Sequence, residues 1–162
     1  MPADSTRSRR KDALRTWLRL LSCESVMEQK LRSLFRDNFT VTLPQFDVLS
    51  ELDRADHPPT MSELSRELKL SNGNITGVID RLVRMGLVER SRPDHDRRIQ
   101  QIVLTSKGTK EFRRMASRHA EWVDKLLAAL SQKDLQQLQA LLVKVRHSIE
   151  SNDSRGHAGA RN

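Results

Sequence analysis

The chain has 162 residues, which is enough for one ordinary domain with its own core. Its single cysteine excludes a disulfide framework and a thiol-built zinc site within one chain, and no apolar run approaches the roughly 18 residues that span a membrane. The net charge of +8 favours a polyanion as partner, and an aromatic content of 4% favours duplex DNA over stacked single strands. We therefore expect a cytoplasmic protein with no membrane partner.

A long amphipathic helix is predicted near the N-terminus. Apolar residues recur at intervals of three and four over residues 12–36. Residues 1–11 are basic and offer no such pattern, so we expect them to be disordered. Thr42 and Pro44 mark the start of a second helix, because proline is tolerated in the first turn.

Two short helices joined by a tight turn follow. Thr60 and Glu63 have the spacing of a capping box, in which each side chain satisfies a free backbone N–H of the other. Ser71 is a natural N-cap for the next helix, and Gly86 closes that helix at a left-handed position. The pattern predicts a helix-turn-helix.

A β-hairpin and two further helices complete the pattern. Segments 87–92 and 99–104, which are β-branched or extended in character, flank a charged hexapeptide and predict a hairpin. Helical periodicity then fills residues 109–150, with a new helix capped by Ser131, and residues 151–162 are predicted to be a disordered tail. The predicted fold class is mainly α with a small β-hairpin wing.

The helix after Ser71 has an outward face of small, polar and cationic side chains. Asn and Thr side chains can hydrogen-bond base edges, and Gly73 and Gly77 would let a duplex approach the helix closely. Each glycine costs about 1 kcal/mol relative to alanine, so an ordinary solvated helix, the alternative interpretation, has little reason to carry two. The candidate DNA-contacting residues of this helix are Ser71, Asn72, Asn74, Thr76, Gly77, Asp80, Arg81 and Arg84.

The hairpin tip adds further candidate DNA contacts. Arg92, Arg97 and Arg98 suit a narrow minor groove, where the negative potential of A·T tracts is concentrated. Asp96 is expected to hold the arginine fork through a bidentate pair. The alternative is a solvated turn of mixed charge.

The run SNGNITGVIDRLVRMGLVERSRPDHDRRIQQIVLTSKG resembles the winged helix-turn-helix core of the MarR family of bacterial regulators. Three parts of the family pattern are met, GLVER by Gly86 to Arg90, D-x-R by Asp96 to Arg98, and LT-x-x-G by Leu104 to Gly108. The resemblance implies that Arg98 enters the minor groove, that Asp96 orients it and that Arg97 contacts a phosphate.

The resemblance also implies an architecture and an assembly. A single MarR-type domain would occupy residues 12–150, with a winged helix-turn-helix over residues 43–108. The helices of residues 12–36 and 109–150 would interlock two copies into a homodimer. The two recognition helices would then enter successive major grooves of a palindromic operator, as expected of a transcriptional repressor.

Control by a small molecule is a further implication of the resemblance. The usual effector is an aromatic acid or its CoA thioester, bound between the dimer helices and the DNA-binding lobe. The WLRLLSCES run is similar to members that respond to hydroxycinnamoyl-CoA esters. Ordinary core packing is the alternative for each candidate lining residue. These candidates are Trp17, Met27, Phe46, His119 and Trp122.

Three other classes of protein compete with this interpretation. A thiol-based redox regulator would use Cys23, but this residue lies mid-helix beside Glu24 rather than among cations. A non-regulatory architectural protein would coat DNA without preferred positions. An enzyme is disfavoured because the five histidines lack metal-ligand spacing and no glycine loop cradles phosphate, so no cofactor or metal is expected.

Overall fold

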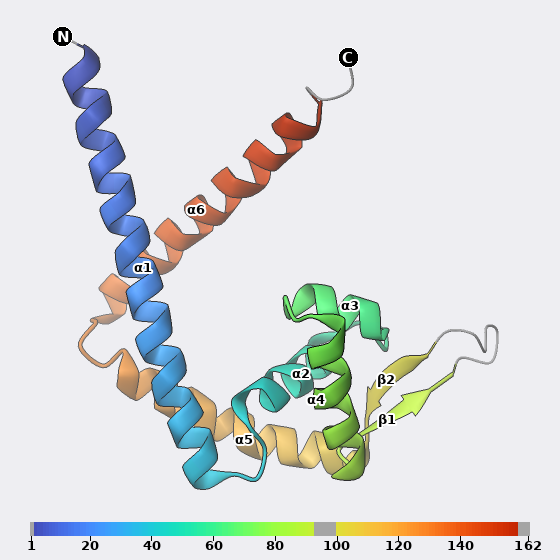
Figure 1. Cartoon of the computed structure of the whole chain (residues 1–162). Coiled ribbons are helices and arrows are strands. Elements are labelled where there is room, and N and C mark those ends of the chain that lie inside the picture. Colours follow the sequence, from blue (N-terminus) through green and yellow to red (C-terminus); the bar gives the residue numbers. More distant parts are fainter. Residues whose placement is uncertain (1, 93–99, 159–162) are drawn as a thin grey trace. The chain divides into compact units, whose positions relative to one another are not determined.

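The computed structural model describes residues 2–92 and 100–158, which form six helices and one two-stranded hairpin (Figure 1). The elements are α1 (Pro2–Asn38), α2 (Leu43–Arg54), α3 (Met61–Glu67), α4 (Asn72–Arg84), β1 (Val88–Ser91), β2 (Gln101–Leu104), α5 (Ser106–Leu126) and α6 (Gln132–Ala158). The predicted fold class, mainly α with a small hairpin wing, is confirmed.

The chain divides into two compact units at α5. The first unit ends at Trp122 and holds α1 to α4, the hairpin and most of α5, while the second begins at Val123 and holds the end of α5 and α6. None of the described helices is long and apolar enough to cross a membrane.

Local capping signals place the helix starts. The backbone N–H of Thr60 donates to Glu63 Oε2 at 2.7 Å, and the N–H of Glu63 donates back to Thr60 Oγ1 at 3.3 Å. At the start of α4, the N–H of Asn74 donates to Ser71 Oγ at 3.3 Å. These contacts satisfy N–H groups that lack a partner within the helix, so both predicted starts are confirmed.

Both terminal helices extend beyond their predicted limits. The first begins at Pro2 instead of residue 12, and the last ends at Ala158 instead of residue 150. Pro2 occupies the first turn, where its missing N–H costs nothing, and no further glycine or proline interrupts the chain before Pro44. At the other end, Gly156 alone does not stop α6. Composition was therefore a poor guide to these two boundaries.

The core of the first unit forms where the C-terminal end of α1 meets α2, α4, β2 and α5. Phe35 of α1 is fully buried, with its ring centroid 4.9 Å from that of Phe46 in α2 and 5.5 Å from that of Trp122 in α5. Leu82 of α4 and Ile102 of β2 are also fully buried. Aromatic pairs in this geometry add about 0.5–1.5 kcal/mol each to the area they bury.

The hairpin pairs β1 with β2 in antiparallel register, with Val88 opposite Leu104. A third extended segment lies beside it, because the N–H of Ile102 donates to the carbonyl of Pro59 at 2.9 Å and Thr60 forms a bridge with Gln101. This contact was not predicted. It fastens the base of the wing to the residue that caps α3.

A buried glycine in the first turn of α5 packs closely against the backbone that follows α4. A Cβ on Gly108 would lie 1.9 Å from the carbonyl oxygen of Leu87, so no side chain fits. The hydroxyl of Thr105 accepts from the N–H of Gly108 at 2.9 Å and donates to the carbonyl of Gly86 at 2.7 Å. The LT-x-x-G motif therefore locks the start of α5 against the end of α4.

Candidate nucleic-acid interface

A tight turn sets α4 against α3. Lys69 adopts a left-handed backbone with φ of 53°, which few non-glycine residues do. The hydroxyl of Ser65 donates to the carbonyl of Leu70 at 2.6 Å, and the N–H of Leu70 donates to the carbonyl of Ser65 at 3.0 Å. These bonds hold the turn closed and direct the start of α4 outward, as in a helix-turn-helix.

The buried face of α4 determines which residues it presents to solvent. Ile75, Ile79 and Leu82 are at most 1% exposed and anchor the helix on the core. Asp80 on the outer side is partly exposed, and the side chain of Asn72 lies outside what the structure describes. The exposed residues of the outer face are Ser71, Gly73, Asn74, Thr76, Gly77, Arg81 and Arg84.

The two glycines on this face have no packing role in the described structure. A Cβ at Gly73 or Gly77 would meet nothing within 4 Å, and neither glycine has a positive φ. Their cost of roughly 1 kcal/mol each therefore has no compensation inside the molecule. The space they leave is on the side where a duplex would approach.

Asp80 has a partner inside the molecule. Its carboxylate accepts a hydrogen bond and ion pair from the Nη2 of Arg90 on β1. The sequence suggested Asp80 as a DNA contact and offered Arg90 only as the last residue of the GLVER motif. The pair links the middle of α4 to the first strand of the wing.

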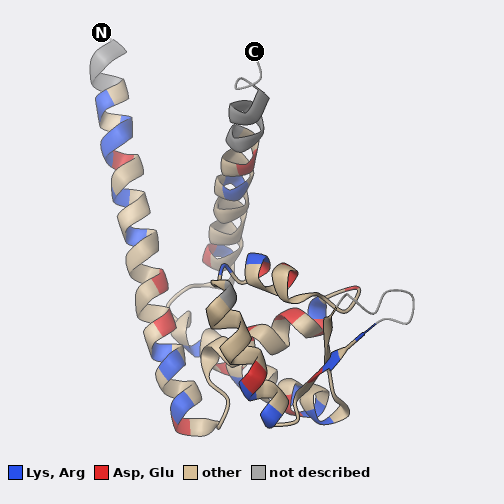
Figure 2. Ribbon diagram, turned by 45° about the vertical axis from the view of Figure 1, so that its right-hand side comes forward, with Lys and Arg blue, Asp and Glu red and all other residues tan. Residues whose placement is uncertain are grey.

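The wing carries basic residues toward its tip. Arg92 is exposed just beyond the end of β1. In the ribbon of Figure 2, Lys and Arg positions, coloured blue, occur on the hairpin arm that leads into the tip. The predicted contacts Asp96, Arg97 and Arg98 lie outside the described residues.

Three predicted effector-binding residues lie together in the core. The ring centroids of Phe46 and His119 are 4.9 Å apart, and Phe35 lies 6.0 Å from His119 and 5.5 Å from Trp122. Burial lowers the pKa of His119, so its ring is neutral near pH 7. Phe46 and Trp122 are about 5% and 6% exposed, as packed core residues are.

The other two candidates lie along α1. Trp17 is 58% exposed, and Met27 is partly exposed. None of the five candidates lines the cavity of about 170 Å³ beside Phe39 or the groove of about 370 Å³ beside Asp47. Cys23, also on α1, is exposed. Within the described ranges, no three His, Cys, Asp or Glu side chains are grouped to hold a metal ion.

A helix-turn-helix with a polar, glycine-containing second helix, followed by a β-hairpin, defines a winged helix-turn-helix protein of the transcription-regulator class. A family model described as the MarR family matches residues 39–99. The uncharacterized HTH-type transcriptional regulator YkoM of Bacillus subtilis (strain 168) is 32% identical over 121 residues, which cover 75% of this chain and 77% of that protein. The chain belongs to the MarR family of winged-helix, DNA-binding transcriptional regulators.

Two further proteins extend the comparison. The HTH-type transcriptional regulator BilQ of Clostridium symbiosum (strain WAL-14163) is 32% identical over 90 residues, and this match spans 56% of the chain but only 62% of BilQ. The S. aureus MepR–DNA complex has a TM-score of 0.66 at 25% identity, covering 82% of this chain and 96% of MepR. The relatives are regulators of transcription rather than enzymes.

Proposed function

We propose that this protein is a sequence-specific repressor that binds a palindromic duplex operator as a homodimer. The exposed face of α4 carries the proposal, because it combines base-reading side chains, cations and two glycines that have no packing role. The structure of MepR with DNA supports the same use of the same fold in a relative.

Each part of the face has a proposed role. The N-terminus of α4, capped by Ser71, directs free backbone N–H groups at a phosphate. Asn74 and Thr76 read base edges, and Arg81 and Arg84 contact phosphates or guanine. Asn72 joins the contacts of the first turn.

The wing supplies the second set of proposed DNA contacts. Arg98 is proposed to enter the minor groove, with Asp96 orienting its guanidinium and Arg97 on a phosphate. Arg92, exposed where the strand ends, is proposed as a further phosphate contact. The Asp80–Arg90 pair holds the base of this wing on α4.

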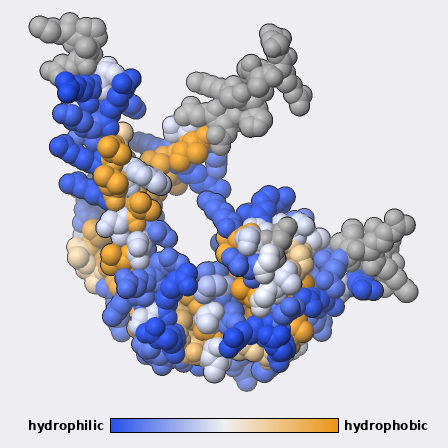
Figure 3. Space-filling view, in the orientation of Figure 1, coloured by the Kyte–Doolittle hydropathy of each residue, from blue (hydrophilic) through white to orange (hydrophobic). Residues whose placement is uncertain are grey.

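Exposed apolar side chains on the terminal helices support the homodimer. Figure 3 shows apolar side chains gathered along α1 and along α6. Stripes of this size on a soluble protein normally mark an interface, and a second copy of the chain is the proposed partner. The residues are Leu14, Trp17, Leu18, Leu21 and Val26 on α1, and Leu138, Leu141, Leu142, Val143, Val145 and Ile149 on α6.

The proposed effector is a small aromatic acid or an aromatic acyl-CoA thioester, including the hydroxycinnamoyl type. Its support is the WLRLLSCES run of α1, in which Trp17 is exposed and available to a ligand or to a second copy. Phe46 and Trp122 are buried in the core, with the partly exposed His119 beside Phe46, and the three rings would form one wall of the effector site.

Footprinting on DNA selected from a random library tests the proposal. The wild-type protein is expected to protect a palindrome whose half-sites lie about one helical turn apart. Arg98→Ala is expected to bind the selected duplex more than about tenfold more weakly, because it removes the minor-groove contact. Uniform protection without preferred positions would identify an architectural protein instead.

A further inference from the structure

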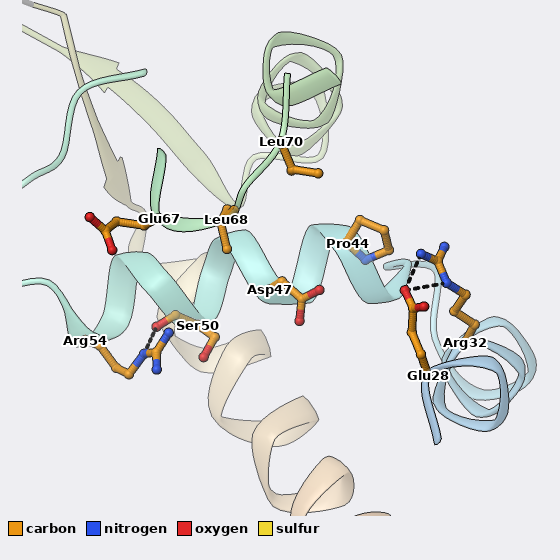
Figure 4. A pocket seen from close by; sticks show the side chains of 9 residues that line it. All are labelled: Glu28, Arg32, Pro44, Asp47, Ser50, Arg54, Glu67, Leu68 and Leu70. Atoms are coloured by element: carbon orange, nitrogen blue, oxygen red, sulfur yellow. Dashed lines mark hydrogen bonds and ion pairs between the residues drawn. The ribbon is translucent and has the colours of Figure 1, made fainter. Parts of the chain in front are cut away.

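A groove of about 370 Å³ opens along α2 (Figure 4). Its walls come from α1, from α2, and from the end of α3 with the turn that follows it, all in the first unit. Pro44, Leu68 and Leu70 supply apolar wall, and Asp47 and Ser50 of α2 supply polar groups. A volume of this size is in the usual range for small-molecule sites.

The charges around the groove leave one carboxylate without a partner. Arg32 donates to Glu28 at 2.6 Å, and Arg54 donates to Glu51 at 2.6 Å, so both guanidinium groups of the groove are already paired. Asp47 lies between these two pairs and makes no hydrogen bond or ion pair with any described residue.

The remaining acidic residue of the groove, Glu67, already has an ion-pair partner. Glu67 on α3 is paired with Arg66 at 3.4 Å. Asp47 is exposed on one side, and its partial burial against the groove walls raises its pKa to about 6, while the charges of Arg32 and Arg54 lower it. Near pH 7.5 the Asp47 carboxylate is therefore ionised and can accept from a cationic hydrogen-bond donor.

We propose that this groove binds a small organic cation, an amine or amidine on an apolar body, with its charged group on the Asp47 carboxylate. The Ser50 hydroxyl is placed to take a second hydrogen bond, and the apolar body packs on Pro44, Leu68 and Leu70. The charge of the ligand is opposite to that of the aromatic acids proposed as effectors, so this is a separate site.

The position of the groove couples it to DNA binding, a step that rests on the proposed function. Leu68 and Leu70 belong to the turn whose Lys69 is left-handed, and Leu70 directly precedes Ser71, the N-cap of α4. A ligand that packs on this turn interacts with the segment that sets the direction of α4. Such coupling between two sites commonly changes affinity by about 5- to 150-fold.

Isothermal titration calorimetry on the full chain without DNA tests the site. Benzamidine is the probe, and neutral benzamide and anionic benzoate are its isosteres. Wild-type protein at pH 7.5 is expected to bind benzamidine saturably and at least about tenfold more tightly than either isostere. Asp47→Asn is expected to lose this preference, while Asp53→Asn, an exposed carboxylate on the same helix that does not line the groove, keeps it.

The pH dependence gives a second readout of the same carboxylate. At pH 5 a group with a pKa of about 6 is only about one-tenth ionised, so wild-type affinity for benzamidine is expected to fall about tenfold from its value at pH 7.5. The Asp47→Asn variant should show no such fall. Equal binding of benzamidine and benzamide, or an unchanged Asp47→Asn variant with native circular dichroism, would overturn the proposal.

The coupling is measured separately with the duplex selected by the wild-type protein. Benzamidine is expected to change wild-type affinity for that duplex by about fivefold or more and to leave the affinity of Asp47→Asn unchanged. Binding of benzamidine without any effect on DNA would overturn the coupling alone. A wild-type protein that selects no DNA sequence would overturn the proposed function, while calorimetry would still decide on the site.

Discussion

Gly77 destabilises α4 relative to an alanine at the same position, and no packing contact in the described structure offsets this loss. It is exposed in α4, a methyl group there would meet no atom within 4 Å, and its φ is not positive. Alanine would therefore fit the backbone and favour the helix by up to about 1 kcal/mol. In the proposed complex the DNA duplex occupies the space that this glycine leaves open.

Gly77→Ala is expected to increase the free energy of unfolding by about 0.5–1 kcal/mol in urea denaturation. It is expected at the same time to weaken binding of the selected duplex by about tenfold or more, because the added methyl group keeps the helix away from the base edges. Fluorescence anisotropy measures the affinity. Ser117→Ala on the exposed side of α5 is the control and should leave DNA binding unchanged. Full affinity in Gly77→Ala would show that the duplex does not lie on this face.

Residues that act on near neighbours could be predicted from the sequence. Thr60 and Glu63 cap α3 through atoms three residues apart, and Ser71 caps α4 in the same way. The partner of Asp80 could not be predicted, because Arg90 reaches it only after α4 has ended and β1 has turned back along it. Phe46 and His119 could be assigned to a helical stripe, but sequence periodicity does not distinguish a packed ring from one that lines a pocket.

The elements α4 and β1 are joined by the Asp80–Arg90 pair. The side chains of Arg90 and Asp80 are 33% and 41% exposed, so the pair contributes at most about 1 kcal/mol to stability. Its effect is instead on geometry, because it fixes the strand that leads to the wing tip relative to the recognition helix. Orientation of this kind matters in the proposed complex, where α4 and the wing enter two grooves at once.

Asp80→Asn is expected to lower the ratio of affinities for the selected duplex and for random duplex by about three- to tenfold. Loss of a negative charge alone would strengthen binding to every duplex equally, so the ratio separates positioning from simple electrostatics. The double variant Asp80→Arg with Arg90→Asp restores the ion pair and should recover part of the ratio. A ratio that stays constant in all three proteins would remove the pair from recognition.

The two strands of the wing could be predicted from the sequence, but the contact between the wing and a distant segment could not. Its two strands follow from β-branched segments around a charged turn, and that prediction was confirmed. The contact of Ile102 with Pro59 was not predicted, because a single bridging residue has no alternating pattern of its own. The Asp47 groove is similar, since its walls come from three elements far apart in the sequence.

The described parts of the terminal helices α1 and α6 carry large apolar side chains that are exposed. Trp17 and Leu14 on α1 are 58% and 59% exposed, and Ile149 on α6 is 59% exposed. The spacing of these residues predicted amphipathic helices, and each described stripe is exposed on its own helix. A second copy covers both stripes in the proposed homodimer.

Leu142→Glu tests the assembly at this scale. The residue is 43% exposed in the middle of the apolar stripe of α6, and a charge buried there in a dimer would cost several kcal/mol. Light scattering is expected to give the mass of two chains for wild-type protein and of one chain for the variant. Gln136→Glu adds the same charge at an exposed position before the stripe and should remain dimeric.

Monomers hold only one half-site at a time, so Leu142→Glu should also lose more than about tenfold in affinity for the full palindrome. A Leu142→Glu protein that still has the mass of two chains would show that α6 is not part of the interface.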